Sequence, residues 1–304
     1  MGYIMTTSKL TKTYGSKDAA KDIDIHIREG KIYGLIGRNG AGKTTIMRML
    51  SGLSSPTSGT FSLFGDEGAA AKKHFAKIGV LIEHPGLYPH LSAYENLKIK
   101  SIALGCYSKQ YVNELLELVG LENAGKKDSG SFSLGMRQRL GIALALVGDP
   151  KLIILDEPIN GLDPQGIVEV RSMLEKLRDE KGITIMISSH ILDELGKLAD
   201  SYGIIHEGRL IDEFTTDELS SRCGKYVVIK AADNDAAVNA LKAAGYQNIE
   251  IDQDHHVRVN EKLDESGKMI KALVNANVVV NEVYVQNTSL EDYYLSVTGG
   301  QHNG

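Results

Sequence analysis

The sequence predicts an α/β protein with a parallel sheet covered by helices on both faces, followed by a small α+β domain. Up to about residue 215, short and continuously apolar runs alternate with stretches of helical period, which is typical of a parallel sheet buried on both sides. Past Arg222 the strands become shorter and the pattern changes. We therefore expect one domain at 1–215 and a second at 225–298, joined by the polar stretch 215–224.

In the first domain, apolar runs and period-two alternation predict the strands, and a 3.6-residue period predicts the helices. A helix should follow Gly42, and residues from about 92 to 147 should form a helical subdomain. The predicted strands are 3–10, 22–27, 32–36, 60–64, 77–82, 152–155 and 183–187, with a hairpin at 202–206 and 209–214.

The second domain reads as β-α-β-β-α-β, which is the ferredoxin-like pattern. Its predicted strands are 226–230, 247–252, 256–259 and 278–285, and its predicted helices are 236–244 and 268–275. No metal-site spacing occurs in this segment. Three roles are open to a domain of this kind: binding a small regulator, stabilising a dimer, or only covering surface. We expect a role in dimerisation or regulation.

Composition excludes several classes of protein. The chain has 304 residues, and 34 Lys and Arg against 39 Asp and Glu give a net charge of −5, which disfavours binding to nucleic acid. The longest apolar run, 140–148, has nine residues, whereas roughly 18 or more are needed to span a bilayer. Any role at a membrane should therefore depend on a partner.

A phosphate-binding loop lies between the strand 32–36 and the helix after it. Residues 37–44 read Gly-Arg-Asn-Gly-Ala-Gly-Lys-Thr and fit the pattern G-x-x-x-x-G-K-[ST]. Glycines let the loop curl until its N–H groups point at one anion, and the helix adds its positive end. Lys43 should reach the β- and γ-phosphates, and the Thr44 hydroxyl should ligate Mg²⁺.

Two carboxylates follow the apolar strand 152–155. Asp156 is expected to hold Mg²⁺, and Glu157 to act as the general base that polarises the attacking water. A carboxylate pair after a buried strand is often only a cap of the strand end. The phosphate loop upstream favours the catalytic interpretation.

Together these motifs resemble the nucleotide-binding subunit of ABC transporters, over residues 3 to about 215. Tyr14 is similar to the aromatic residue that stacks on adenine in that family, and His190 to its switch histidine. Ser133 and Gly135 occupy the place of the family signature, and Asp163 ends the loop that follows the catalytic glutamate. Taken singly, each of these residues also fits a purely structural role, such as that of a helix cap for Ser133.

The resemblance implies an ATPase that uses ATP and Mg²⁺ and forms a head-to-tail homodimer when ATP binds. In the family, the signature of one subunit covers the γ-phosphate held by the loop of the other. The expected ATP contacts are Tyr14, Gly37, Asn39, Gly40, Gly42, Lys43, Thr44, Thr45, Ser133, Gly135 and Asp163.

The sequence departs from the family pattern at three positions. Leu134 and Met136 replace a Gly and the Gln of the signature, and Glu83 stands where a Gln senses Mg²⁺ and the attacking water. An ionised Glu only accepts hydrogen bonds, but its oxygen suits Mg²⁺. Glu83 is therefore a candidate metal ligand and catalytic residue, or else a solvated loop residue. These features resemble the bacitracin-export and lantibiotic-immunity branch.

The resemblance implies an ATP-hydrolysing subunit that powers a separate membrane permease and exports an antimicrobial peptide or related amphiphile. It should lie in the cytoplasm, at the cytoplasmic face of the membrane, with no nucleic-acid partner. The alternative is a soluble nucleotide switch that is not coupled to transport. Such switches carry a coiled-coil insertion or tandem nucleotide domains, and the sequence has neither. A module that binds but does not hydrolyse ATP is disfavoured by Glu157.

Overall fold

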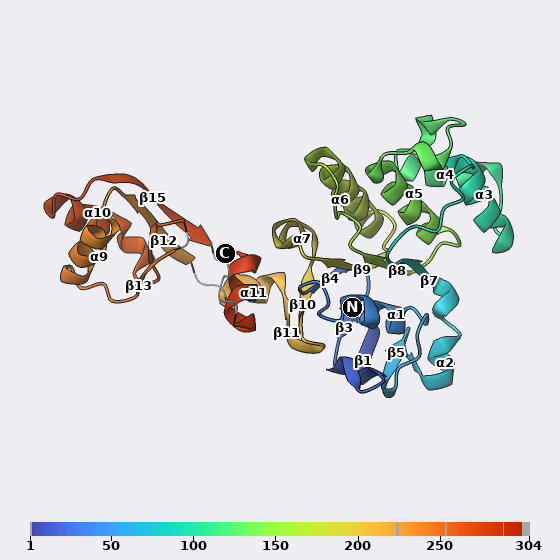
Figure 1. Cartoon of the computed structure of the whole chain (residues 1–304), viewed down its shortest axis with the longest axis horizontal. Coiled ribbons are helices and arrows are strands. Elements are labelled where there is room, and N and C mark those ends of the chain that lie inside the picture. The colour runs from blue at the N-terminus through green and yellow to red at the C-terminus, as the bar shows by residue number, and fades with distance from the viewer. Residues whose placement is uncertain (1, 223–224, 253, 288, 300–304) are drawn as a thin grey trace. The chain divides into compact units, whose positions relative to one another are not determined.

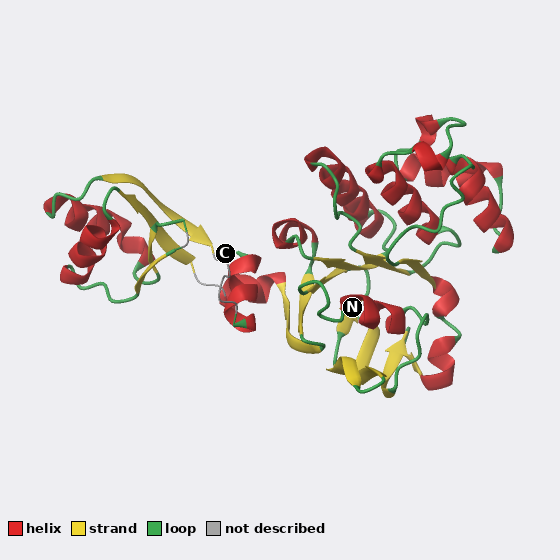
Figure 2. Cartoon of the chain, viewed as in Figure 1, coloured by secondary structure: helices red, strands yellow, loops and turns green. Residues whose placement is uncertain are grey.

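A computed structural model describes residues 2–222, 225–252, 254–287 and 289–299. These residues form two compact units, Met1–Thr216 and Asp217–Gly304. Each unit has its own hydrophobic core. Figure 2 shows helices and strands in both.

The main sheet of the first unit has six strands in the order β11-β10-β4-β9-β8-β7. Neighbours are parallel, except that β11 is antiparallel to β10. Every residue of β4, β8 and β9 is buried, as expected for a sheet with helices on both faces. The strands are β4 (Ile32–Ile36), β7 (Ile78–Leu81), β8 (Leu152–Asp156), β9 (Thr184–Ser189), β10 (Ser201–His206) and β11 (Arg209–Thr215).

A second, antiparallel sheet completes the first unit. Its strands are β1 (Tyr3–Tyr14), β2 (Lys17–Ile23), β3 (His26–Arg28), β5 (Ser58–Leu63) and β6 (Asp66–Glu67). The prediction of one strand over 22–27 was wrong, because β2 ends at Ile23 and β3 begins only at His26. The Thr7 hydroxyl bridges the break, donating to Ile23 O and accepting from Ile25 N.

Helices cover both faces of the main sheet (Figure 1). α1 (Lys43–Leu50) lies between the two sheets, and its residues Ile46, Met47 and Leu50 belong to the core. The other helices of this unit are α2 (Gly68–Lys72), α3 (Ala93–Ala103), α4 (Lys109–Leu118), α5 (Leu134–Leu146), α6 (Pro164–Asp179) and α7 (Leu192–Leu198), with short 3-10 turns at Phe75–Lys77, Glu122–Ala124 and Ser129–Ser131.

The second unit confirms the ferredoxin-like prediction. Its antiparallel sheet has the order β13-β14-β12-β15, so the first and third strands of the unit lie in the centre. Its elements are β12 (Lys225–Ala231), α9 (Asn234–Ala243), β13 (Ile249–Ile251), β14 (Val257–Val259), the turn Leu263–Glu265, α10 (Ser266–Asn275), β15 (Val280–Asn287) and α11 (Leu290–Thr298).

The polar stretch 215–224, predicted to join the two domains, is largely helical. Most of it forms the helix α8 (Thr216–Arg222). Asp217 and Glu218 occupy the first turn of this helix, where negative charge is stabilised by the helix dipole.

Candidate active site

The predicted phosphate loop curls at the edge of the main sheet, between β4 and α1. Gly40 and Gly42 have φ values of 82° and 108°, in the left-handed region that favours glycine. A Cβ atom on Gly42 would lie 2.5 Å from the carbonyl oxygen of Ala19. The loop can therefore take this shape only with glycine at this position.

A pocket of about 330 Å³ opens over the loop. Its walls come from the loop, the start of β2, the end of β8 and the turn between β10 and β11. Most of the residues predicted to bind the phosphates and the metal line it: Asn39, Gly40, Gly42, Lys43, Thr44, Thr45, Asp156 and Glu157.

Lys43 is buried at the base of this pocket, with 6% of its surface exposed. Its Nζ donates to the carbonyl oxygen of Gly37 at 2.6 Å. It also lies 3.3 Å from Glu157 Oε1. The structure thus places the cation of the loop beside the carboxylate predicted to be the base.

Asp156 ends β8 with its carboxylate held from two sides. Thr44 Oγ1 donates to Asp156 Oδ2 at 2.7 Å, and Ser188 Oγ donates to Asp156 Oδ1 at 2.6 Å. Asp156 and Thr44 thus bring two oxygen donors together at the pocket wall. Hydroxyl and carboxylate oxygens suit Mg²⁺, a hard cation.

Glu157 turns into the pocket immediately after β8. Its φ is 50°, a left-handed conformation that is unusual for a residue with a side chain. Its Oε2 lies 2.8 Å from His190 Nδ1. Its Oε1 is buried and makes no hydrogen bond with any described residue, although Lys43 is within ion-pair distance. A buried acceptor of this kind suits a water molecule.

The remaining predicted ATP contacts lie outside this pocket. Tyr14 ends β1 with 51% of its surface exposed, and Lys12 Nζ lies 5.1 Å from its ring centre. Ser133 caps α5 by accepting a hydrogen bond from Met136 N, and Asp163 caps α6 through Gly166 N. Gly135 follows in the first turn of α5.

Glu83 also lies apart from the pocket lining. It has φ 64° and follows β7. Its Oε1 is 2.7 Å from Arg48 Nη2 on α1. Both side chains are exposed, by 58% for Glu83 and 41% for Arg48.

Two residues at the site were not singled out from the sequence. Ser188 is fully buried next to Asp156, and Arg48 pairs with Glu83. A polar residue near the carboxyl end of an apolar strand was the available signal for Ser188. Its contact with Asp156 depends on β8 and β9 being neighbours, which the sequence pattern alone does not specify.

Known proteins resemble the chain along its whole length. The ABC transporter family model matches residues 20–160. The bacitracin transport ATP-binding protein BcrA of Bacillus licheniformis is 45% identical over 302 residues, which cover 99% of each chain. The lantibiotic transport ATP-binding protein SrtF of Streptococcus pyogenes is 49% identical over 210 residues, covering 69% of this chain and 90% of SrtF.

Solved structures agree with these matches. The cbiO1 protein of Clostridium perfringens, part of the ABC transporter complex cbiONQ, is 28% identical, with a TM-score of 0.66 over 73% of this chain and 92% of its own. The dimeric ATP-binding cassette MJ0796, bound to ADP and Pi, is 25% identical, with a TM-score of 0.63 over 70% of this chain and 98% of its own. The predicted family is confirmed: the chain belongs to the ATP-binding subunits of ABC transporters, which are ATPases coupled to transport.

Proposed function

We propose that this chain hydrolyses ATP in the pocket above the phosphate loop and thereby drives export of an antimicrobial peptide or related amphiphile by a separate permease. One observation carries the catalytic part: Lys43, Asp156 and Glu157 meet at one pocket, and His190 contacts Glu157. The names of the relatives, which transport bacitracin and a lantibiotic, support the class of substrate.

The residues divide the chemistry between them. Lys43 and the loop N–H groups, including those of Asn39, Gly40 and Thr45, would hold the phosphates. Thr44 and Asp156 would hold Mg²⁺, which supplies charge neutralisation for the leaving phosphates. Glu83 would reach the same ion after leaving Arg48. Tyr14 would stack on adenine.

Glu157 is the proposed general base. It takes a proton from water as the water oxygen bonds to the γ-phosphorus, and the bond from that phosphorus to the bridging oxygen breaks. The products are ADP and inorganic phosphate. His190 lies 2.8 Å from Glu157 Oε2. It orients the carboxylate through this contact with its second oxygen.

The signature residues suit a role between two copies. Ser133, Gly135 and Asp163 sit at the N-termini of α5 and α6, where free N–H groups favour an anion. They do not line the pocket of their own chain. We infer that they cover the γ-phosphate bound by a second copy, so that ATP holds a homodimer together.

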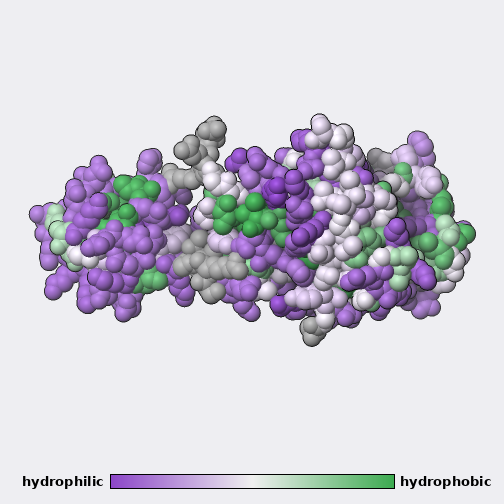
Figure 3. Space-filling view, turned by 90° about the horizontal axis from the view of Figure 1, so that it is seen from below, coloured by the Kyte–Doolittle hydropathy of each residue, from purple (hydrophilic) through white to green (hydrophobic). Residues whose placement is uncertain are grey.

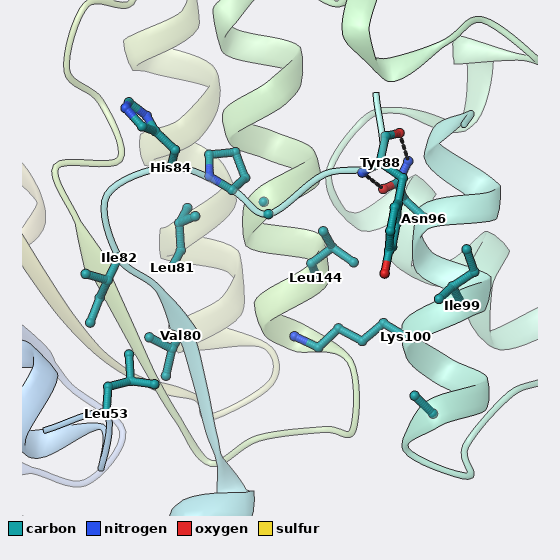
Figure 4. Close-up of a pocket in the computed structure, with 14 residues that line it drawn as sticks. Leu53, Val80, Leu81, Ile82, His84, Tyr88, Asn96, Ile99, Lys100 and Leu144 are labelled. Atoms are coloured by element: carbon teal, nitrogen blue, oxygen red, sulfur yellow. Dashed lines mark hydrogen bonds between the residues drawn. The ribbon is translucent and has the colours of Figure 1, made fainter. Parts of the chain in front are cut away.

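A second cavity offers a surface for the permease. It has a volume of about 500 Å³ and lies between β7, α3 and α5 (Figure 4). Large apolar side chains at its lining are open to solvent, with exposures of 64% for Leu53, 56% for Tyr88 and 41% for Ile99. A hollow edged by exposed apolar side chains often marks a protein interface.

Lys100 places a positive charge at this cavity, which favours a negatively charged group on a partner. Its side chain extends from α3 into the cavity (Figure 4), and burial lowers the pKa of its ammonium group. No acidic side chain is found among the described residues that line this cavity. A segment of the permease that carries apolar side chains and one carboxylate would fit this surface.

The chain would thus work at the cytoplasmic face of the membrane, attached through its permease. No helix in the described part of the chain combines the length and apolar character needed to cross a bilayer. The docking cavity and the residues that bind ATP lie in the same unit, which suits transfer of motion between them.

The test is peptide resistance in cells that express this chain together with its permease. We expect survival in bacitracin or a lantibiotic to require the chain and to be lost in Glu157→Gln, which removes the base. Glu180→Gln, an exposed glutamate that follows α6, is the matched control and should protect fully. Equal protection by Glu157→Gln would contradict the proposal.

A further inference from the structure

One buried hydroxyl joins both acidic residues of the pocket. Ser188 has no exposed surface. Its Oγ donates to Asp156 Oδ1 at 2.6 Å and accepts from Glu157 N at 2.9 Å. A serine hydroxyl has one proton to donate and lone pairs to accept, so both interactions can exist together.

The sheet register brings Ser188 to this place. β8 and β9 are parallel neighbours, and Asp156 pairs with Ser188 in the register. With Thr44 on Oδ2 and Ser188 on Oδ1, the carboxylate of Asp156 cannot rotate without losing a charge-assisted hydrogen bond. If Thr44 turns its oxygen to a metal ion, Ser188 still fixes the orientation of Asp156.

The same hydroxyl holds the backbone of Glu157. A non-glycine residue in the left-handed region is strained, and Glu157 has φ 50°. The hydrogen bond from Glu157 N to Ser188 Oγ stabilises this conformation. That conformation directs the side chain toward His190.

We propose that Ser188 is a positioning residue for ATP hydrolysis, acting through Asp156 and Glu157. It does not line the pocket and so acts without touching the phosphates. This inference rests on the proposed function, because Ser188 would act only by positioning the residues that carry out the proposed hydrolysis.

The test compares Ser188→Ala with the wild-type chain in steady-state hydrolysis. We expect kcat to fall roughly 10- to 100-fold, which is typical when a partner that orients a ligand is removed. The Mg²⁺ concentration for half-maximal rate should rise several-fold, while the KM for ATP changes little. A purely structural role for Ser188 would not separate kcat from KM in this way.

Thr184→Val is the matched control. Thr184 lies at the other end of β9, is equally buried, and accepts a hydrogen bond from Gly30 N. Its loss should lower the melting temperature by an amount similar to that for Ser188→Ala but leave kcat and the Mg²⁺ dependence at wild-type values.

A second variant and the activity of the wild-type chain separate the possible outcomes. If Ser188→Ala does not fold, Ser188→Cys, which nearly keeps the side-chain volume but has a weak donor, should show the same loss of kcat. Wild-type kcat and Mg²⁺ dependence in the folded variant would overturn the role of Ser188. Absence of hydrolysis by the wild-type chain itself would instead overturn the proposed function.

Discussion

Glu83 carries a negative charge that Arg48 balances across 2.7 Å. Exposed ion pairs contribute about 0–1 kcal/mol, and both of these side chains are more than a third exposed. The pair can therefore separate at little cost. Ile82 and His84, on either side of Glu83, both line the cavity proposed for the permease, so a movement of Glu83 would be felt there.

Glu83→Gln tests this position. We expect ATP binding to persist and stability to change by less than about 1 kcal/mol, because the lost pair is exposed. Coupling should change, so that the permease stimulates hydrolysis to a different extent and peptide resistance shifts. Glu29→Gln, an exposed glutamate in a turn, is the control. Resistance and ATPase rate both equal to wild type would exclude a role for Glu83.

Lys100 links stability to partner binding. Burial holds the pKa of its ammonium group below the ordinary value of 10.5, so the unfolded chain binds more protons between the two pKa values. The free energy of unfolding should therefore rise with pH through that interval. The full cost of the buried charge is present below the folded-state pKa.

Replacing Lys100 with methionine removes this cost. At pH 7, Lys100→Met should stabilise the isolated chain, seen as a higher melting temperature, because methionine carries no charge to desolvate. The part of this difference that comes from the charge should fade as the pH rises past 10.5. The same variant should bind the permease more weakly in co-purification. Unchanged stability together with unchanged binding would show that Lys100 serves neither purpose.

The elements of the site follow closely from sequence patterns. The apolar runs at 32–36, 152–155 and 183–187 predicted β4, β8 and β9, and the glycine-rich loop predicted the start of α1. The side-chain contacts between these elements could not be predicted from the sequence. The contact between Ser188 and Asp156 depends on strand order, and the pair of Arg48 and Glu83 spans 35 positions of the chain.

Local hydrogen bonding lies behind the other differences between the predicted and the observed elements. Between β2 and β3 the Thr7 hydroxyl donates to Ile23 O and accepts from Ile25 N, and hydrophobic periodicity does not reveal such contacts. Conversely, the caps of α5 and α6 are residues that the family resemblance had marked for ATP.

Ser133→Ala separates capping from nucleotide contact. The loss of an N-cap should cost about 1 kcal/mol in the free energy of unfolding, and ATP-dependent dimerisation should also weaken. Ser108 is the matched control, because it is an exposed cap of α4 that accepts from Tyr111 N. Ser108→Ala should lose similar stability without affecting the dimer, measured by light scattering with Glu157→Gln as the background. Equal dimerisation in both variants would leave Ser133 as a cap only.

At the scale of the whole molecule, the chain is an ATPase unit with an added unit that has its own core. The surface of the added unit is mainly hydrophilic in the view of Figure 3, with a small apolar patch. SrtF matches this chain over 210 residues, about the length of the first unit. All the residues that line the pocket belong to the first unit.

A chain shortened to residues 1–216 should therefore fold and hydrolyse ATP within about threefold of the full-length rate, since a domain with its own core can fold alone. Phosphate release and the melting curve measure this. A loss of hydrolysis in a folded fragment would assign the second unit a part in catalysis.

The central claim is that one pocket, built around Lys43, binds and hydrolyses ATP. The most direct measurement is phosphate release from Mg²⁺-ATP by the purified chain and by Lys43→Ala. The rate should fall by about 100-fold or more in the variant, because a preorganised cation at the phosphates is lost. Equal rates for a folded Lys43→Ala chain and the wild type would contradict the account.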